Sequence, residues 1–187
     1  MSNSTKRILA LSLKKLLSKT PLDNITVAQL TDEAEVSRKT FYYHFHDIYD
    51  LVEWALVDDG SRMIKETLKT SDWSNGISSL FDYMLSNRSL ILNIYHGINR
   101  STIEKWLIQY LKPFFLALIE EYPESSTLDA EDKDFMCSLY SFGLSGLFLH
   151  WIDEGMTSDP QPIISRINRF IRDNPNKNIH SMLLNYV

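Results

Sequence analysis

The chain has 187 residues, of which 44% are hydrophobic and 23% are charged, typical of a soluble globular protein with one domain or one domain and a small appendage. Its one cysteine, Cys137, excludes an internal disulfide framework and a cysteine-based zinc cluster, which favours a cytoplasmic location. We expect no signal peptide, because the N-terminal segment lacks an uninterrupted apolar core. The longest apolar-rich runs, residues 111–119 and 142–152, are shorter than the about 20 residues of a membrane span, so we predict no membrane partner.

The net charge of −5 does not favour a nucleic-acid partner. Residues 1–50, however, hold seven basic and six acidic side chains, whereas the rest of the chain holds 12 basic and 18 acidic ones. The N-terminal part is therefore the least acidic, although it is not a basic patch by composition. Charge permits DNA binding there without demonstrating it.

The first segment reads as an amphipathic helix. Its apolar residues recur every three or four positions, and it ends near Thr20 because the residue before a proline is driven out of the helical conformation. The apolar stripe is predicted at Ile8, Leu9, Leu13, Leu16 and Leu17, and Lys14, Lys15 and Lys19 are expected to form a solvated opposite face.

The rest of the chain is also predicted to be helical, because no segment shows the alternation of β-strands. Thr26 and Gln29 form a capping box that opens a short second helix ending near residue 34. Ser37 caps a third helix that ends near residue 45, and Asp47 caps a long fourth one. Further helices are expected over 74–86, 89–96, 102–121, 129–154 and 160–172, with a kink or break at Pro113. The predicted fold is all-α: a three-helix N-terminal domain and a C-terminal helical bundle.

The second and third helices form a helix-turn-helix motif. Ala34 and Val36 supply the small residue and the apolar residue that the turn requires. Along the third helix, Phe41 and Phe45 point together into a small core. The opposite surface carries basic, hydroxyl and phenol groups that suit a DNA major groove. These outward residues are Arg38, Lys39, Thr40, Tyr42 and Tyr43.

Residues 5–55 resemble the DNA-binding domain of TetR-family transcriptional regulators. The resemblance is carried by a threonine-capped second helix, a small-residue turn followed by Val-Ser, and an aromatic-rich third helix. In this sequence these elements are Thr26-Val27-Ala28-Gln29-Leu30, Ala34-Glu35-Val36-Ser37 and Thr40-Phe41-Tyr42-Tyr43-His44-Phe45.

The resemblance implies which side chains contact DNA. Arg38, Lys39, Thr40 and His44 match positions that read bases or adjacent phosphates, and Thr26, Ser37, Tyr42 and Tyr43 match phosphate-contacting positions. Two residues depart from the family pattern. Lys39 stands where a small residue is usual, which adds a cation to the groove. Ile48 stands where the family commonly has a lysine that contacts the DNA backbone. His46 is a candidate to make this phosphate contact in place of the lysine.

Residues 41–54 also resemble a narrower subgroup that includes an activator of dihydroxyacetone kinase operons. This similarity leaves two possibilities open. The protein could activate transcription, and a protein partner could control it in place of a small molecule.

For the C-terminal part, the resemblance implies a helical effector-binding and dimerisation domain over residues 51–187, after a DNA-binding domain over residues 1–50. A ligand pocket is expected among the fourth to eighth helices, near Tyr83, Tyr95, Trp106 and Tyr140. The two long helices at 129–154 and 160–172 are expected to form a four-helix interface in a homodimer, although ordinary packing within one chain is the alternative. The interface residues are predicted to be Phe142, Gly143, Gly146 and Leu149.

No metal site, cofactor or catalytic apparatus is predicted, because the five histidines lack metal-binding spacing and no phosphate loop or nucleophile motif occurs. The sequence favours a homodimeric repressor that binds a palindromic operator in double-stranded DNA and responds to a small-molecule inducer or a co-regulator protein. The alternatives are a TetR-like activator or a helical adaptor that works through a protein partner. An enzyme ranks third.

Overall fold

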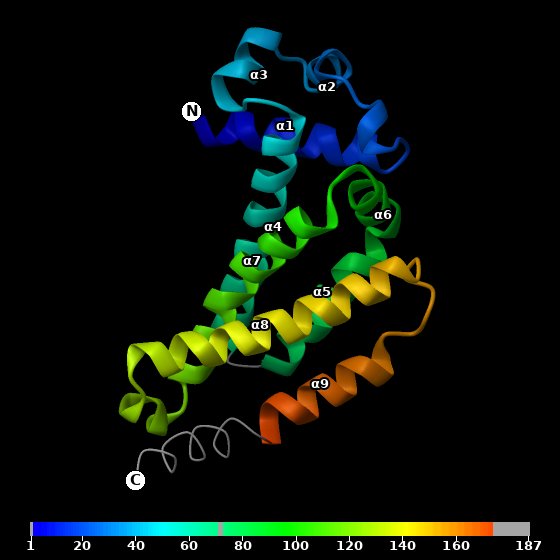
Figure 1. Ribbon diagram of the computed structural model, residues 1–187. Helices are drawn as coiled ribbons and strands as arrows, with labels where there is room; N and C mark the ends of the chain where they lie inside the picture. Colours follow the sequence, from blue (N-terminus) through cyan, green and yellow to red (C-terminus); the bar gives the residue numbers. More distant parts are fainter. Residues whose placement is uncertain (1, 71–72, 174–187) are drawn as a thin grey trace. The chain divides into compact units, whose positions relative to one another are not determined.

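The computed structural model describes residues 2–70 and 73–173, and the C-terminal tail considered in the sequence lies outside this range. Over the described residues the chain forms α-helices and two short 3-10 helices and no strand, which confirms the all-α prediction (Figure 1). The elements are α1 (Ser2–Leu17), η1 (Leu22–Asn24), α2 (Val27–Glu33), α3 (Arg38–His44), α4 (Ile48–Thr70), α5 (Trp73–Ser86), α6 (Arg88–Gly97), α7 (Arg100–Glu120), η2 (Pro123–Thr127), α8 (Ala130–Asp153) and α9 (Gln161–Asp173).

The helix ends lie within about three residues of the predicted ones, because local capping signals determine them. Thr26 and Ser37 cap α2 and α3 as predicted, and Asp129 accepts a hydrogen bond from the amide of Asp132 at the start of α8. Of the kink or break expected at Pro113, the break does not occur, because α7 is continuous through this residue.

The chain divides into two compact units that are not consecutive in sequence. Unit 1 contains residues 1–62 and 83–103, and unit 2 contains residues 63–82 and 104–187. These units are defined by packing, whereas the boundary proposed at residue 50 concerns function and stays a prediction.

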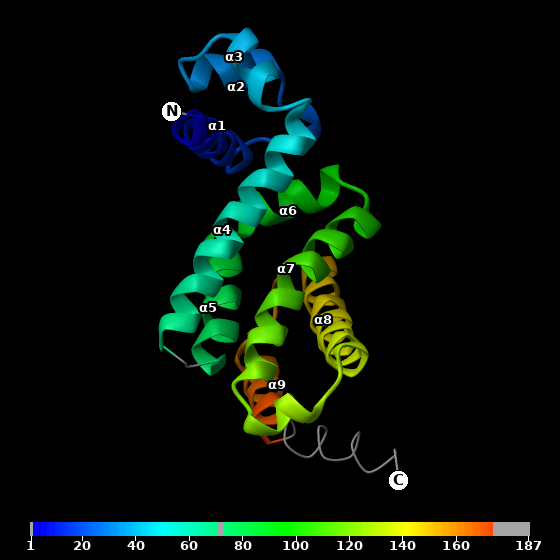
Figure 2. The same cartoon turned by 90° about the vertical axis from the view of Figure 1, so that its left-hand side faces the viewer.

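In unit 1, α2 and α3 lie on the same side of α1 (Figures 1 and 2). Leu9, Leu13 and Leu17 are buried along one side of α1, as the four-residue spacing predicts. Ile8 differs from the prediction, since 47% of its surface is exposed. One residue of helix turns by about 100°, which carries Ile8 away from the line through Leu9 and Leu13.

Helix α6 also belongs to unit 1, and its C-terminal end packs closely against η1. The side-chain amide of Asn93 donates a hydrogen bond of 2.8 Å to the carbonyl of Leu17 at the end of α1. A β-carbon added at Gly97 would lie 2.8 Å from the β-carbon of Leu22. Glycine is therefore required at position 97 by this close approach.

Replacing Gly97 with alanine should lower the free energy of unfolding by about 1 kcal/mol, because η1 and α6 must separate and the higher helix propensity of alanine offsets only part of that cost. Chemical denaturation measures the change. Ser89→Ala, at an exposed position of the same helix, should stay within about 0.5 kcal/mol. A Gly97→Ala protein as stable as the wild type would contradict the close approach.

Unit 2 has an aromatic core in which α5 and α8 meet. The ring of Phe81 lies 4.7 Å from that of Phe148 and 5.1 Å from that of Trp151. The thiol of Cys137 is buried, as expected for a small apolar residue, and this burial raises its pKa, so it stays protonated at neutral pH.

By length and composition alone, α8 could cross a membrane, which the short apolar runs of the sequence did not suggest. Half of its most apolar window is buried inside the protein. A core helix of a water-soluble protein has the same character.

Candidate nucleic-acid interface

The turn between α2 and α3 is built around one residue in the left-handed region. Glu35 has a φ of 53°, which few non-glycine residues adopt. The amide of Val36 donates a hydrogen bond of 3.0 Å to the carbonyl of Thr31, and the small side chain of Ala34 is buried beneath the turn. The turn thus redirects the chain so that α3 starts on the surface, as the helix-turn-helix prediction requires.

The capping box at the start of α2 is complete. The amide of Gln29 donates to the hydroxyl of Thr26 at 3.2 Å, and the amide of Thr26 donates to the side-chain oxygen of Gln29 at 2.9 Å. The Thr26 hydroxyl also donates to this oxygen at 3.0 Å. This end of α2 is exposed, so it can present its hydroxyl and its helix dipole to a phosphate.

Helix α3 presents a buried aromatic side and an exposed polar one. Phe41 and Phe45 are buried at 0% and 3% exposure, which confirms the predicted core positions. Tyr42 and Tyr43 are exposed at 59% and 81%. Both phenol rings therefore contribute little to the core, and both hydroxyls are accessible for donating a hydrogen bond to an anion.

The N-terminal turn of α3 carries the cations. Arg38 and Lys39 are exposed, whereas Thr40 and His44 are half-buried. The hydroxyl of Ser37 accepts a hydrogen bond of 3.0 Å from the amide of Thr40, and the two hydroxyls lie 2.8 Å apart. Ser37 therefore orders the first turn of α3 as well as being a candidate phosphate contact.

Lys6 was not predicted from the sequence to have a role, but it makes a cation–π contact between the start of α1 and the end of α3. Its ammonium nitrogen lies 5.1 Å from the centroid of the Phe45 ring and 5.6 Å from that of Trp54. Cations are attracted to aromatic faces at these distances. The signal was not visible locally, because Lys6 is distant in sequence from both rings.

At the start of α4, two carboxylates accept hydrogen bonds from backbone amides. Asp47 accepts a hydrogen bond of 2.9 Å from the amide of Asp50, and Asp50 accepts one of 3.0 Å from the amide of His46. The bond from the Asp50 amide lowers the pKa of Asp47 below its usual value. The side chain of His46 is 92% exposed, so the candidate phosphate contact is accessible.

The three lysines expected to form a solvated face of α1 differ in their surroundings. Lys15 is exposed and pairs with Glu33 of α2. Lys14, in contrast, is three-quarters buried at the side chain and pairs with Asp59 of α4. Lys14 lies at the edge of the apolar stripe, where a carboxylate from another helix can reach it.

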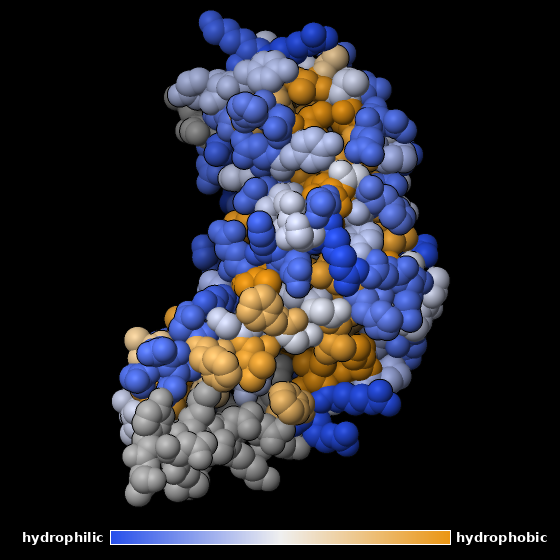
Figure 3. Space-filling model, in the orientation of Figure 1, coloured by the Kyte–Doolittle hydropathy of each residue, from blue (hydrophilic) through white to orange (hydrophobic). Residues whose placement is uncertain are grey.

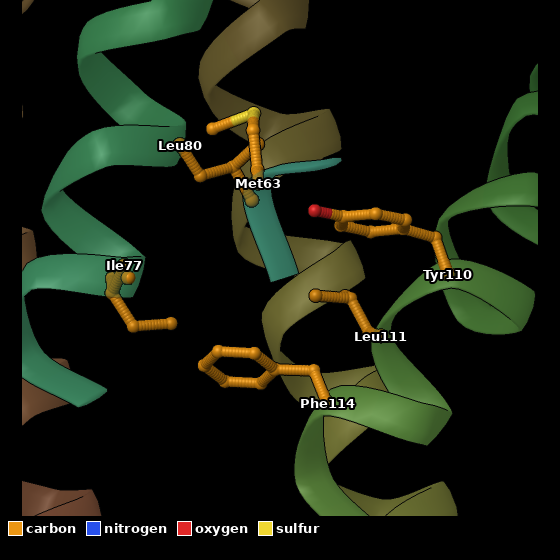
Figure 4. Close-up of a pocket in the computed structure, with 7 residues that line it drawn as sticks. Met63, Ile77, Leu80, Tyr110, Leu111 and Phe114 are labelled. Carbon is orange, nitrogen blue, oxygen red and sulfur yellow. The ribbon is translucent and has the colours of Figure 1, made fainter. Parts of the chain in front are cut away.

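Unit 2 contains a small apolar pocket between α4, α5 and α7 (Figure 4). Its volume of about 10 Å³ is space for roughly one water-sized molecule. Figure 4 shows the Tyr110 hydroxyl as the polar group on the labelled side chains around it. The lining residues are Met63, Gly76, Ile77, Leu80, Tyr110, Leu111 and Phe114.

The four residues predicted to line a ligand site lie elsewhere, and their role stays a prediction. In unit 1, the Tyr83 hydroxyl donates to Asp59 at 2.6 Å, and the Tyr95 hydroxyl accepts from Arg100 at 2.9 Å. In unit 2, Trp106 is half-buried. The Tyr140 ring packs 5.4 Å from that of Phe115 and 6.4 Å from that of Phe170.

One side of α8 exposes an apolar stripe, and Figure 3 shows apolar side chains gathered over the region of α8 and α9. Phe135, Leu139 and Phe142 are exposed at 55%, 58% and 55%. A β-carbon added at Gly143 or Gly146 would meet nothing within 4 Å.

Leu149, the fourth predicted interface residue, differs from the others because it is only 1% exposed and packs within its own chain. From Gly143, it lies about 600° along a helix that turns 100° per residue, which places it about 120° from Gly143 around the axis.

The chain is similar to known transcription factors. It is 23% identical over 134 residues to the HTH-type dhaKLM operon transcriptional activator DhaS of Lactococcus lactis subsp. lactis (strain IL1403), an alignment that covers 71% of each chain. A solved structure of the dihydroxyacetone kinase operon activator DhaS matches with a TM-score of 0.72 and 19% identity, covering 92% of this chain and 96% of that one. NalD, the secondary repressor of the MexAB-OprM multidrug efflux pump in Pseudomonas aeruginosa, matches with a TM-score of 0.51 and 13% identity, covering 92% and 95%.

Two family models match the chain. The model of bacterial regulatory proteins of the tetR family matches residues 12–55, which include α2 and α3. The model of a transcriptional regulator C-terminal region matches residues 71–173, more than half of the chain. These matches confirm the resemblance on which the sequence prediction depends. The chain is therefore a transcriptional regulator that belongs to the TetR family.

Proposed function

We propose that the chain binds a specific DNA operator by inserting α3 into the major groove. The observation that carries this proposal is the division of α3 into a buried aromatic side and an exposed basic and phenolic side. Phe41 is fully buried, while Tyr42 and Tyr43 are exposed next to the cations at the N-terminus of the helix. A helix that is anchored from behind and polar in front suits a groove that admits one helix.

The side chains divide naturally between two tasks. Arg38 and Lys39 extend from the first turn of α3, where they can reach guanine acceptors or phosphates. The hydroxyls of Tyr42 and Tyr43, and that of Thr26 once it turns away from Gln29, can donate to phosphate oxygens on either side of the groove. This division would fix the orientation of α3 and leave its N-terminal turn to read the sequence.

The proposal includes a homodimer in the cytoplasm that binds a palindromic operator. An exposed apolar stripe on α8, with two glycines that leave open space, supports a helix-to-helix contact with a second copy. A dimer with two-fold symmetry would place one α3 in each of two half-sites about one helical turn or more apart. A ligand or partner acting on residues 51–187 would control the separation of the two α3 helices.

A mobility-shift experiment tests DNA binding directly. The probe is DNA from the upstream region of the protein's own gene, with unrelated DNA of equal length as the control, followed by a salt titration. Specific retention that weakens steeply with salt is expected, because several phosphate contacts release counterions. Failure to retain this probe and any sequence selected from random DNA would favour the adaptor alternative.

We propose first that the protein represses transcription, and activation is the second candidate. The similarity to DhaS, which its name describes as an operon activator, favours the second. A transcriptional reporter placed behind the bound fragment distinguishes them in a strain without the regulator. Reporter output should rise after deletion of a repressor and fall after deletion of an activator.

A further inference from the structure

Asp59 is exceptional among the charged residues that the structure describes. It is 7% exposed, and no other Asp, Glu, Lys or Arg in the described part of the chain is buried. A buried carboxylate loses its hydrogen bonds to water, and donors of the protein must replace them. Its partners therefore show which elements it holds.

Three donors from three helices converge on the Asp59 carboxylate of α4. Lys14 reaches it from α1, and Arg62 reaches it from the next turn of α4. The Tyr83 hydroxyl of α5 donates a hydrogen bond of 2.6 Å to the same oxygen that Lys14 contacts. Lys14, Asp59 and Tyr83 form a connected cluster across α1, α4 and α5, all within unit 1.

A gap in the packing between α1 and α4 lies beside this cluster. A cavity of about 100 Å³ between α1 and α4 borders it. Its rim carries further charges: Arg7 of α1 lies 3.7 Å from Asp58, which also lies 3.4 Å from Arg62. Where side chains do not interdigitate, close packing cannot fix the position of one helix on another. The charged cluster is therefore a specific contact between α1 and α4 beside this cavity.

The position of α1 matters for DNA binding, because α1 forms the base on which α2 and α3 lie (Figure 2). We propose that the Lys14–Asp59–Tyr83 cluster couples α5 to the DNA-binding surface by fixing α1 against α4. A ligand or partner that displaces α5 would break the Tyr83 bond and release α1, which lowers operator affinity. This inference rests on the proposed function, since the coupled surface is the one that binds DNA.

The coupling predicts a non-additive effect of two substitutions. Tyr83→Phe removes one hydroxyl, so it should weaken operator binding roughly threefold by leaving α1 less preorganised. In a Lys14→Met background α1 is already released from Asp59, so the same substitution should change the affinity by less than about 1.5-fold. Fluorescence anisotropy with labelled operator gives all four dissociation constants. Tyr122→Phe, which removes a phenol hydroxyl in unit 2, is the matched control.

An equal factor in both backgrounds, or no effect of Tyr83→Phe in either, would overturn the coupling. Amide hydrogen exchange provides a readout that needs no DNA. Tyr83→Phe should speed exchange along the second half of α1, and Tyr122→Phe should not. If the wild-type protein binds no operator, the proposed function fails, but unchanged exchange in α1 is still the result that rejects the cluster's role.

Discussion

The double variant Lys39→Ala and Tyr42→Ala should bind the operator about 100-fold more weakly than the wild type, because a dimer loses two groove cations and two phosphate hydroxyls. Both side chains are exposed. Removing them should therefore leave the far-ultraviolet circular dichroism spectrum and the dimer intact. Anisotropy measured against salt tests the mechanism as well as the affinity.

The single variants separate the two contributions. If Lys39 pairs with a phosphate, Lys39→Ala should reduce the slope of log affinity against log salt by about two per dimer. If Lys39 reads a base, the loss should depend on the operator sequence and disappear on one altered base pair. Tyr42→Ala should weaken binding with little change of slope, because a phenol carries no charge. Unchanged operator affinity in both variants would contradict the proposal that α3 inserts into the major groove.

Phe142→Glu should convert the proposed homodimer into a monomer, raising its dissociation constant by at least about 100-fold, because the change places a charge in the centre of the proposed interface. Phe142 is 55% exposed within one chain, so the folded protomer should tolerate the change. Analytical ultracentrifugation measures the mass, and the monomer should also lose most operator affinity because only one half-site is engaged.

Leu116→Glu is the matched control for this variant. Leu116 is also exposed, at 39%, but lies on α7 outside the α8 stripe. It should leave the mass unchanged. A Phe142→Glu protein that is still dimeric would show that the α8 stripe is not the contact between copies, and would return this surface to the alternative of packing within one chain.

Much of the fold could be predicted from the sequence because the information is local. A threonine or serine before a helix must satisfy free amides, and Thr26 and Ser37 do so at the expected positions. The four-residue spacing of Phe41 and Phe45 determines that both point the same way, and both are buried. Their burial leaves the rest of α3 for the surface.

The unpredicted contacts involve residues that are distant in sequence. Lys14 meets Asp59 45 positions away, and Asn93 meets the carbonyl of Leu17 76 positions away. A helical period shows which side of α1 is apolar, but it cannot show which residue of another helix covers the edge of that side. Lys14 therefore looks like a solvated lysine in the sequence and is a paired one in the structure.

The interleaved order of unit 1 has a consequence for protein engineering. A chimera that joins the first fifty residues to a foreign sensor would discard the partners of α1 and η1 at Asp59, Asn93 and Gly97. The transplanted segment would then have a backbone carbonyl without its hydrogen-bond donor and a lysine without its carboxylate partner. A graft that preserves its stability must bring residues 51–62 and 83–103 with it, so the natural unit of exchange for this regulator is discontinuous.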